Sequence, residues 1–278
     1  MPARAVTAVL CLLAVAGCTV QERTKPVTPD SPPPVVESSS RPEGSWWRPR
    51  VGVSWQVQLQ GRIDTSVRAE VYDVDLFDVP EETIQELHRQ GRKVICYVNV
   101  GAHETWRPDA DRFPEEGIGK PLEDWPGERW LDIRRLDVLE PIMAARMDLC
   151  KRKGFDAVDP DNVNGYRNDS GFPLTADDQL RYNRMVARLA HERRLGVALK
   201  NDLAQVPDLV RDFDFAINEE CVAKKECEAL EPFIEAGKAV LHVEYNVSTE
   251  EFCPLTKALH FSSIRKPKDL SAGREPCP

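Results

Sequence analysis

Short apolar segments alternate with helical patterns along most of the chain. Several of these segments are nearly continuous apolar runs, a pattern typical of strands that are buried on both faces of a sheet. We predict eight strands, at residues 53–58, 69–76, 93–98, 155–158, 196–199, 213–217, 239–243 and 260–264. Eight strands alternating with helices predict a single-domain α/β fold, the (β/α)8 TIM barrel, with an open doubly wound sheet as the alternative.

The helical segments between the strands carry start and stop signals. Thr175 is a candidate N-cap, with two acidic residues in the first turn behind it. Four helices are predicted, which begin near Pro80, Leu139, Thr175 and Glu226 and are followed by glycine at positions 91, 154, 196 and 237. Residues 61–68 are too few for a full helix and the helix after the eighth strand is doubtful, so we expect the first and last helices to be short or missing.

The N-terminal part of the sequence predicts export. Residues 6–16 are apolar but too few to span a bilayer, and small residues lead directly to Cys18. This pattern is typical of a lipoprotein signal peptide, residues 1–18, with lipidation at Cys18; an ordinary secretory signal is the alternative. Residues 19–44 are rich in proline and serine and predict a disordered linker, which leaves residues 45–278 as the folded domain. The protein is therefore expected to be anchored to the cell membrane facing outside, or secreted.

Cysteine content supports an oxidising location. Beyond Cys11 and Cys18, the chain has cysteines at positions 96, 150, 221, 227, 253 and 277. Six cysteines in an exported protein suggest disulfides. Cys221 and Cys227 are near enough in sequence to close a small loop; Cys96 with Cys150, and Cys253 with Cys277, would complete the set. Sequence alone allows 15 connectivities, and a zinc site is disfavoured because no CxxC pair occurs.

Charge narrows the range of partners. The 278 residues carry a formal net charge of -9, which disfavours nucleic acid as a partner and suits a cationic or neutral ligand. Contact with the membrane is expected only through the lipid anchor, and the protein is expected to be a monomer.

Polar side chains gather after the predicted strands, where the active sites of such barrels lie. The segment 154–166 is the clearest case, because its apolar run ends in Asp159 and Asp161. Carboxylates and amides bind sugar hydroxyls, and flat aromatic rings stack on sugars. The strand-end residues are Trp55, Gln56, Tyr72, Asp73, Asp75, Tyr97, Asn99, His103, Glu104, Asp159, Asp161, Asn162, Lys200, Asn201, Asp202, Asn218, Glu219, Glu220, Glu244 and Tyr245.

Two acids in this set suit glycoside hydrolysis, which uses a pair of carboxyl groups on either side of one bond. Asp161 after the fourth predicted strand and Glu219 after the sixth could converge across the rim. Other assignments remain open at this point: Asp159 could orient a neighbour, and Glu244 could neutralise Lys200. Lys200 could also form a Schiff base, which would make the protein a lyase.

Eight segments of the chain together resemble the endo-α-1,4-polygalactosaminidases, glycoside hydrolase family 114. They are residues 55–61, 72–78, 94–101, 130–134, 154–166, 199–202, 213–221 and 238–245. The resemblance implies a TIM barrel that acts on galactosamine-containing polysaccharides. It also implies that Asp161 is the nucleophile and Glu219 the proton donor, whereas Asn164 stands where the family pattern has aspartate.

The leading hypothesis from the sequence is an exported glycosidase that cleaves internal α-1,4-galactosaminide linkages, without cofactor or metal ion. A partly deacetylated galactosaminan is cationic and suits an acidic rim. The substrate-binding candidates are Trp55, Tyr72, Asp73, Asp75, Tyr97, Asn99, Asp159, Asn162, Lys200, Asn201 and Glu244. A non-catalytic carbohydrate-binding lipoprotein on the same barrel is the second hypothesis, and the Lys200 lyase the third.

Overall fold

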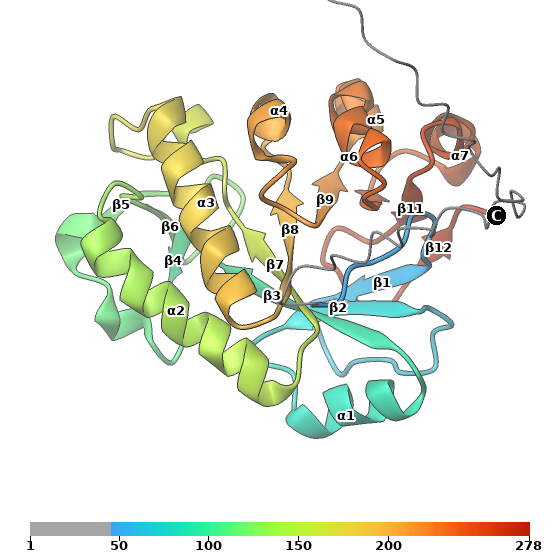
Figure 1. Cartoon of the computed structure of the whole chain (residues 1–278), viewed down its shortest axis with the longest axis horizontal. Coiled ribbons are helices and arrows are strands. Elements are labelled where there is room, and N and C mark those ends of the chain that lie inside the picture. The colour runs from blue at the N-terminus through green and yellow to red at the C-terminus, as the bar shows by residue number, and fades with distance from the viewer. Residues whose placement is uncertain (1–45) are drawn as a thin grey trace, which may run out of the picture. The chain divides into compact units, whose positions relative to one another are not determined.

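The computed structural model describes residues 46–278, so the predicted signal peptide with Cys18 and the predicted linker lie outside the described residues. Eight parallel strands form one curled sheet, and a ninth short strand pairs antiparallel to the last of them (Figure 1). In spatial order the strands are β1 (Trp55–Gln58), β2 (Val71–Asp75), β3 (Lys93–Asn99), β7 (Ala157–Asp161), β8 (Gly196–Lys200), β9 (Phe215–Glu219), β10 (Val240–Glu244), β11 (Ser262–Arg265) and β12 (Glu275–Pro276).

The two faces of this sheet bury separate apolar clusters, because successive strand side chains point to opposite faces. On β3, Ile95 packs inside the curl with Trp55 and Phe215. Its neighbours Val94 and Cys96 belong to the larger cluster between sheet and helices. Burial on both faces explains why the strand sequences are nearly continuous apolar runs.

The curl brings the first strand to the eighth. No backbone ladder joins β1 to β11 in the described sheet. Instead the buried Trp55 indole Nε1 donates a hydrogen bond to the Ser262 carbonyl at 2.8 Å. The predicted barrel fold is confirmed in this form: a mostly parallel, curled sheet of the TIM-barrel type.

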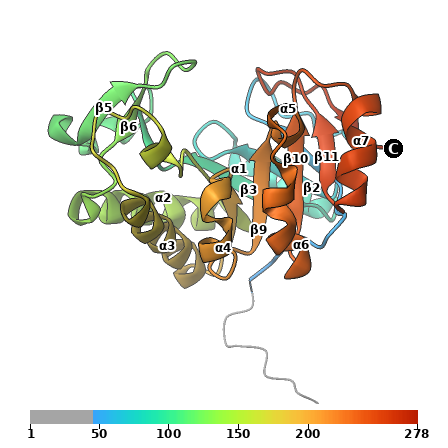
Figure 2. The same ribbon diagram turned by 90° about the horizontal axis from the view of Figure 1, so that it is seen from above.

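Helices cover the outer face of the sheet (Figure 2). They are α1 (Glu81–Arg89), α2 (Leu136–Lys153), α3 (Ala176–Glu192), α4 (Val206–Leu209), α5 (Cys221–Lys224), α6 (Glu231–Glu235) and α7 (Thr249–Ala258). Thr175 caps α3 as predicted, in a reciprocal pair of hydrogen bonds with Asp178. Within residues 46–278, no helix joins β1 to β2 and none follows β11, as expected. None of the described helices combines the length and the apolar character that a membrane span needs.

The helix predicted from Glu226 to Ala236 is shorter than expected. A 3-10 turn occupies Cys227–Leu230, and only α6 is α-helical. Pro232 stands in the first turn of α6, a position that tolerates proline because its N–H would be unpaired there. The helix therefore begins late, after the turn.

An inserted sheet between β3 and α2 was not predicted. It consists of β4 (Ala102–Glu104), β5 (Ile118–Pro121) and β6 (Glu128–Leu131), in the antiparallel order β4-β6-β5. In Figure 2 its strands β5 and β6 stand apart from the main sheet, at the upper left above α2. The strands are short and carry charged residues, so they lack the apolar pattern that marks the barrel strands.

Two site strands end later than predicted. Asp159 and Asp161 are residues of β7 itself, on either side of Pro160, whereas the predicted strand ended at Val158. Glu219 is likewise the last residue of β9. Because side chains alternate along a strand, Asp159 and Asp161 point to the same face, one above the other.

Three disulfides join all six cysteines of the described domain. The pairs are Cys96–Cys150, Cys221–Cys227 and Cys253–Cys277. They agree with the pairing suggested from the sequence. Three disulfides are typical of an extracytoplasmic protein.

Candidate active site

A cleft of about 760 Å³ opens where the barrel strands end. The inserted sheet forms part of its wall through Glu104, Glu128 and Trp130. Ten of the predicted catalytic and substrate-binding residues line this cleft: Trp55, Asp73, Asp75, Tyr97, Asp159, Asp161, Asn162, Lys200, Asn201 and Glu219.

Asp161 and Glu219 converge on the ammonium of Lys200, which ends the strand between theirs. Lys200 Nζ lies 3.0 Å from Asp161 Oδ1 and 3.3 Å from Glu219 Oε2. The lysine side chain is 7% exposed, and the two carboxylates are 20% and 25% exposed. Two carboxyl groups from non-adjacent strands therefore meet at one point and still face the cleft.

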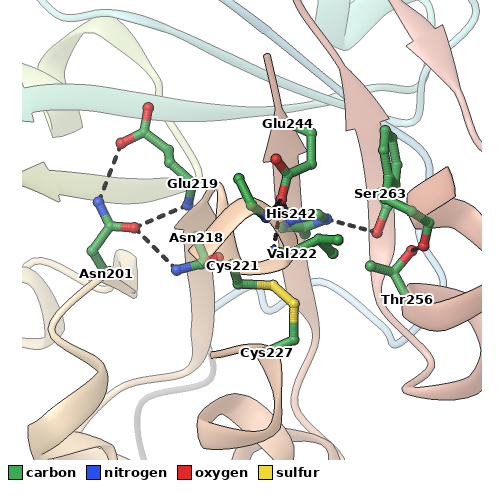
Figure 3. Close-up of a disulfide and its surroundings, with 12 residues drawn as sticks. Asn201, Asn218, Glu219, Cys221, Val222, Cys227, His242, Glu244, Thr256 and Ser263 are labelled. Carbon is green, nitrogen blue, oxygen red and sulfur yellow. Dashed lines mark hydrogen bonds and ion pairs between the residues drawn. A yellow bond between two sulfur atoms is a disulfide. The ribbon is translucent and has the colours of Figure 1, made fainter. Parts of the chain in front are cut away.

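Hydrogen bonds hold both carboxylates in place. The Tyr97 hydroxyl donates to Asp161 Oδ2 at 2.8 Å, and the Tyr245 hydroxyl donates to Glu219 Oε1. Asn201 Nδ2 donates to Glu219 Oε2 at 3.2 Å, and Asn201 Oδ1 accepts from the Glu219 backbone N–H at 2.9 Å (Figure 3). Charge-assisted bonds of this kind are stronger than neutral ones and fix the direction of the carboxylate.

The backbone turns sharply after each of the three charged residues. Asn162, Asn201 and Glu220, which follow them directly, have φ angles of 61°, 51° and 63°. Residues other than glycine seldom adopt this left-handed region, and such strain concentrates at functional sites. The turns end the strands at the point where the charged side chains face the cleft.

The charges of this group set one another's protonation. Burial raises the pKa of Glu219, but Lys200 and the hydrogen bonds from Tyr245 and Asn201 lower it by more, so it lies below its usual range. Burial lowers the pKa of Lys200, but Asp161 and Glu219 raise it well above the usual range. Lys200 is therefore a stable ammonium at neutral pH, and Glu219 is a carboxylate.

A second acidic pair lies beneath the first, at the floor of the cleft. Asp73 on β2 and Asp159 on β7 are 0% and 2% exposed. Burial, followed by the charge of Asp159, raises the pKa of Asp73 well above its usual range. Burial also raises the pKa of Asp159, to about 7, and Lys200 opposes this rise. The floor pair therefore holds its protons to a higher pH than Glu219 does.

A third group of charges lies where the inserted sheet meets the barrel. Arg107 forms ion pairs with Asp75 at 2.6 Å and with Glu104 at 2.7 Å. Glu128 Oε2 accepts a hydrogen bond from Asn99 Nδ2 at 2.8 Å. Burial raises the pKa of both glutamates to about 7. The main partner of Asp75 is thus Arg107, with which it forms an ion pair that was not predicted from the sequence.

Three predicted substrate-binding residues do not line the cleft, and their direct contact with substrate is not supported. The Tyr72 hydroxyl donates to the Asp64 and Val67 carbonyls, because its side chain is on the opposite face of β2 from Asp73. Asn99 is 1% exposed and is bonded to Glu128.

Glu244 is the third of these residues and is fully buried. Its Oε1 accepts from the Val222 backbone N–H at the start of α5 (2.8 Å) and contacts His242 Nε2 at 3.0 Å (Figure 3). It thus interacts with a helix start instead of neutralising Lys200. His242 is buried and also contacts Ser263 Oγ at 3.0 Å, so both of its ring nitrogens have a partner.

Figure 3 also shows the one group in the described part of the chain whose atoms are close enough to share a metal ion: Cys221, Cys227 and His242. The two sulfur atoms are joined in a disulfide. Because a metal needs thiolates, this group cannot bind one while the disulfide is intact.

Four residues that line the cleft were not predicted from the sequence: Glu128, Arg107, Trp106 and Trp125. They lie in the inserted sheet and its loops, for which no elements were predicted. The two tryptophans are 53% and 47% exposed. A signal was present, because both stand in otherwise polar segments where no core pattern requires a large aromatic residue.

Comparison with known proteins agrees with this geometry. The chain is similar to *Aspergillus fumigatus* Ega3, whose crystal structure contains galactosamine: identity is 40%, the match covers 83% of this chain and 97% of that one, and the TM-score is 0.79. The glycoside hydrolase domain of PelA from *Pseudomonas aeruginosa* shares the fold, with 11% identity, 80% and 97% coverage and a TM-score of 0.63. No curated protein sequence gave a match. Residues 37–278 match the profile of glycoside-hydrolase family GH114, and the chain therefore belongs to this family and is a glycosidase.

Proposed function

We propose that this protein is an exported hydrolase that cleaves internal α-1,4-galactosaminide linkages of a galactosamine-rich polysaccharide. The observation that carries the proposal is the convergence of Asp161 and Glu219 on Lys200 inside a cleft rich in carboxylates. The similarity to Ega3, which was crystallised with galactosamine, supports an amino sugar as the recognised unit. An acidic cleft would attract the cationic, deacetylated polymer.

In the proposed reaction the two carboxyl groups act in sequence. Glu219 protonates the glycosidic oxygen as its bond to the anomeric carbon breaks, and Asp161 attacks that carbon to form a glycosyl ester. Glu219, now a carboxylate, removes a proton from water, which then cleaves the ester and frees Asp161. Because Glu219 must carry a proton to begin and its pKa lies below the usual range, the rate should rise as the pH falls from neutral towards that pKa.

The spacing of the two groups favours retention of configuration. Asp161 Oδ1 lies 3.0 Å and Glu219 Oε2 3.3 Å from Lys200 Nζ, so these oxygens are at most about 6.3 Å apart, just below the usual separation of about 6.5–9.5 Å for inversion. NMR of the first product formed from an α-linked substrate should therefore show the α anomer. Initial release of the β anomer would contradict the nucleophilic role of Asp161.

The lyase hypothesis is not favoured. A Schiff-base lysine must lose its proton to attack a carbonyl. The pKa of Lys200 is instead held well above its usual range, since two carboxylates outweigh the effect of burial. Borohydride trapping with substrate should accordingly give no adduct on Lys200.

The anchor is a separate part of the proposal. We propose that Cys18 carries lipid and holds the domain on the outer side of the cell membrane through the linker, as the sequence pattern predicts. Labelling with a fatty-acid analogue should mark the wild-type protein and not the Cys18→Ser variant. Label on both would exclude lipidation at this residue.

Incubation with galactosaminan, before and after deacetylation, followed by product sizing tests the activity. We expect short oligosaccharides from internal cleavage. Glu219→Gln should reduce the rate by about 10²–10⁴-fold, the usual contribution of a general acid, and Asp161→Asn by at least as much. Glu220→Gln is the matched control, because Glu220 faces Lys224 at 3.6 Å and does not line the cleft. Full activity in Asp161→Asn or Glu219→Gln would exclude the assigned role.

A further inference from the structure

The inserted sheet places two glutamates side by side in the wall of the cleft. Glu104 on β4 and Glu128 on β6 are cross-strand partners, and both are at least nine-tenths buried. Like charges directly opposite each other destabilise a sheet unless a proton or a cation lies near them. This pair is distinct from Asp161 and Glu219, and the proposed reaction does not use it.

The charges around the pair do not balance. Arg107 is bound to Glu104 Oε1, but it also forms ion pairs with Asp75 and Asp78. Among residues 46–278, the neutral amide of Asn99 is the only donor to Glu128. Glu104 Oε2 is buried, and no donor in the same part of the chain reaches it. One guanidinium thus forms ion pairs with three carboxylates, and within the described residues the fourth, Glu128, has no ion pair.

The pair is also near the reacting groups. Tyr97 donates a hydrogen bond to Asp161, and burial together with the charges of Asp161, Glu104 and Glu128 raises the pKa of its hydroxyl. Asp161 also acts on Glu128, whose pKa is raised first by burial and then by Glu104 and Asp161. Glu104, Glu128 and Asp161 line the same cleft, so a saccharide bound at Asp161 would come within reach of the glutamate pair.

An aromatic surface adjoins the pair at the rim of the cleft. Trp106, two residues after Glu104, is 53% exposed. Its ring lies against Gly127: a Cβ added to that glycine would be 2.7 Å from the ring. The backbone at Gly127 therefore packs against the exposed ring, and Trp106 lines the cleft, where an aromatic side chain can stack on a sugar.

We propose that Glu128, supported by the charge of Glu104 behind it, binds the ammonium group of a galactosamine unit in the cleft. This inference rests on the proposed function, because it assigns the selection of the free amine over the N-acetyl group to that same cleft. The buried carboxyl pair supplies the missing counter-charge for one ammonium, and Trp106 offers a flat surface for a neighbouring ring. An N-acetyl group, which is neutral and larger, would leave the pair without its cation.

The test compares Glu128→Gln with wild type on α-1,4-galactosaminan in its deacetylated and fully acetylated forms. For the deacetylated polymer, kcat/KM should fall at least about tenfold, the usual weight of a hydrogen bond to a charged group. For the acetylated polymer it should not fall. Glu104→Gln should act in the same direction, and its melting temperature will show whether loss of the Arg107 pair has unfolded it. Glu123→Gln, a change of the same charge at an exposed position of the same wall, is the matched control and should change little.

Calorimetric titration with galactosamine and N-acetylgalactosamine gives a readout that needs no turnover. Galactosamine should bind the wild-type protein more tightly than N-acetylgalactosamine, and Glu128→Gln should remove the difference. Retention of wild-type amine preference in Glu128→Gln, or equal loss in Glu123→Gln, would overturn the inference. If wild type binds galactosamine through Glu128 but releases no product from the polymer, the proposed function fails and the amine site stands.

Discussion

Four carboxyl groups lie around Lys200 in two layers. The layers differ in the solvent exposure of their carboxyl groups and in the hydrogen bonds that these groups accept. In the upper layer, Asp161 and Glu219 are partly exposed, and both accept hydrogen bonds from side chains of the cleft. In the lower layer, both oxygens of Asp73 and one of Asp159 are buried, without a donor among residues 46–278. Desolvation disfavours a charged carboxylate and hydrogen bonds favour it. The upper layer is therefore suited to ionic chemistry and the lower layer to keeping a proton.

The comparison supports Asp161, the nucleophile that the sequence predicts, over its neighbour Asp159. Asp159 and Asp161 are two residues apart on β7 and face the same way. Asp161 forms an ion pair with Lys200, accepts a hydrogen bond from Tyr97 and is 20% exposed. Asp159 lies beneath it and is only 2% exposed. Only Asp161 combines an open face with fixed orientation, which a nucleophile requires. Asp159 is better suited to support Lys200 from below.

Among the residues that support the two reacting carboxylates, Lys200 should show the largest effect when it is replaced, because it is the cation that both layers share. Lys200→Met should lower kcat/KM about 10²-fold, since a displacement of about 1 Å in a catalytic group can cost that much. Loss of the ammonium also raises the pKa of Glu219, so its protonated form persists to higher pH. The alkaline limb of the kcat/KM profile should therefore move to higher pH.

Lys238→Met is the matched control for this experiment. Lys238 is another partly buried lysine, but it donates to the Phe213 carbonyl at 2.5 Å and does not line the cleft. We expect its pH profile to match that of wild type. An alkaline limb that stays in place or moves to lower pH in Lys200→Met would argue against Glu219 as the proton donor.

A smaller, pH-dependent effect should follow from Asp159→Asn. The pKa of Asp159 is raised to about 7, mainly by burial, so at pH 5 the group is neutral and asparagine closely resembles it. Activity at pH 5 should stay close to wild type and diverge above pH 7, where the wild-type group ionises. Rates measured from pH 5 to 8 beside Asp161→Asn provide the check. A loss at pH 5 as severe as that of Asp161→Asn would place Asp159 among the reacting groups.

The sequence predicted the barrel because its strands are buried on both faces and therefore read as apolar runs. It also predicted that Asp161, Lys200 and Glu219 lie together at the rim, because each of them follows such a run, and all three line the cleft. The division of the carboxyl groups into two layers could not be predicted. The exposure of the Asp159 and Asp161 carboxyl groups depends on how closely the neighbouring strands pack around them. The partner of Glu244 was equally out of reach, because it is the backbone at the start of α5, in another part of the chain.

The inserted sheet marks a second limit. Its three strands span three or four residues each, too few to establish an alternating pattern. Glu104 and Glu128 are neighbours because of the register in which β4 pairs with β6, and no local sequence pattern specifies that register. Prediction from the sequence thus worked where burial imposes a long pattern and failed where short segments meet through tertiary contacts.

The smallest effect on activity, and a distinct effect on stability, is expected for Asp73→Asn. The folded state raises the pKa of Asp73 well above its value in the unfolded chain, through burial and the charge of Asp159. The folded state therefore holds the proton more tightly than the unfolded chain does. As pH rises from the unfolded-state pKa towards the folded-state pKa, the free energy of unfolding falls by about 1.4 kcal/mol for each unit that separates the two pKa values. Asparagine cannot ionise, so the variant should lose less stability than wild type between pH 5 and pH 8 in urea denaturation. Equal losses would mean that Asp73 is not held protonated, and the contrast between the two layers would then depend on Asp159 alone.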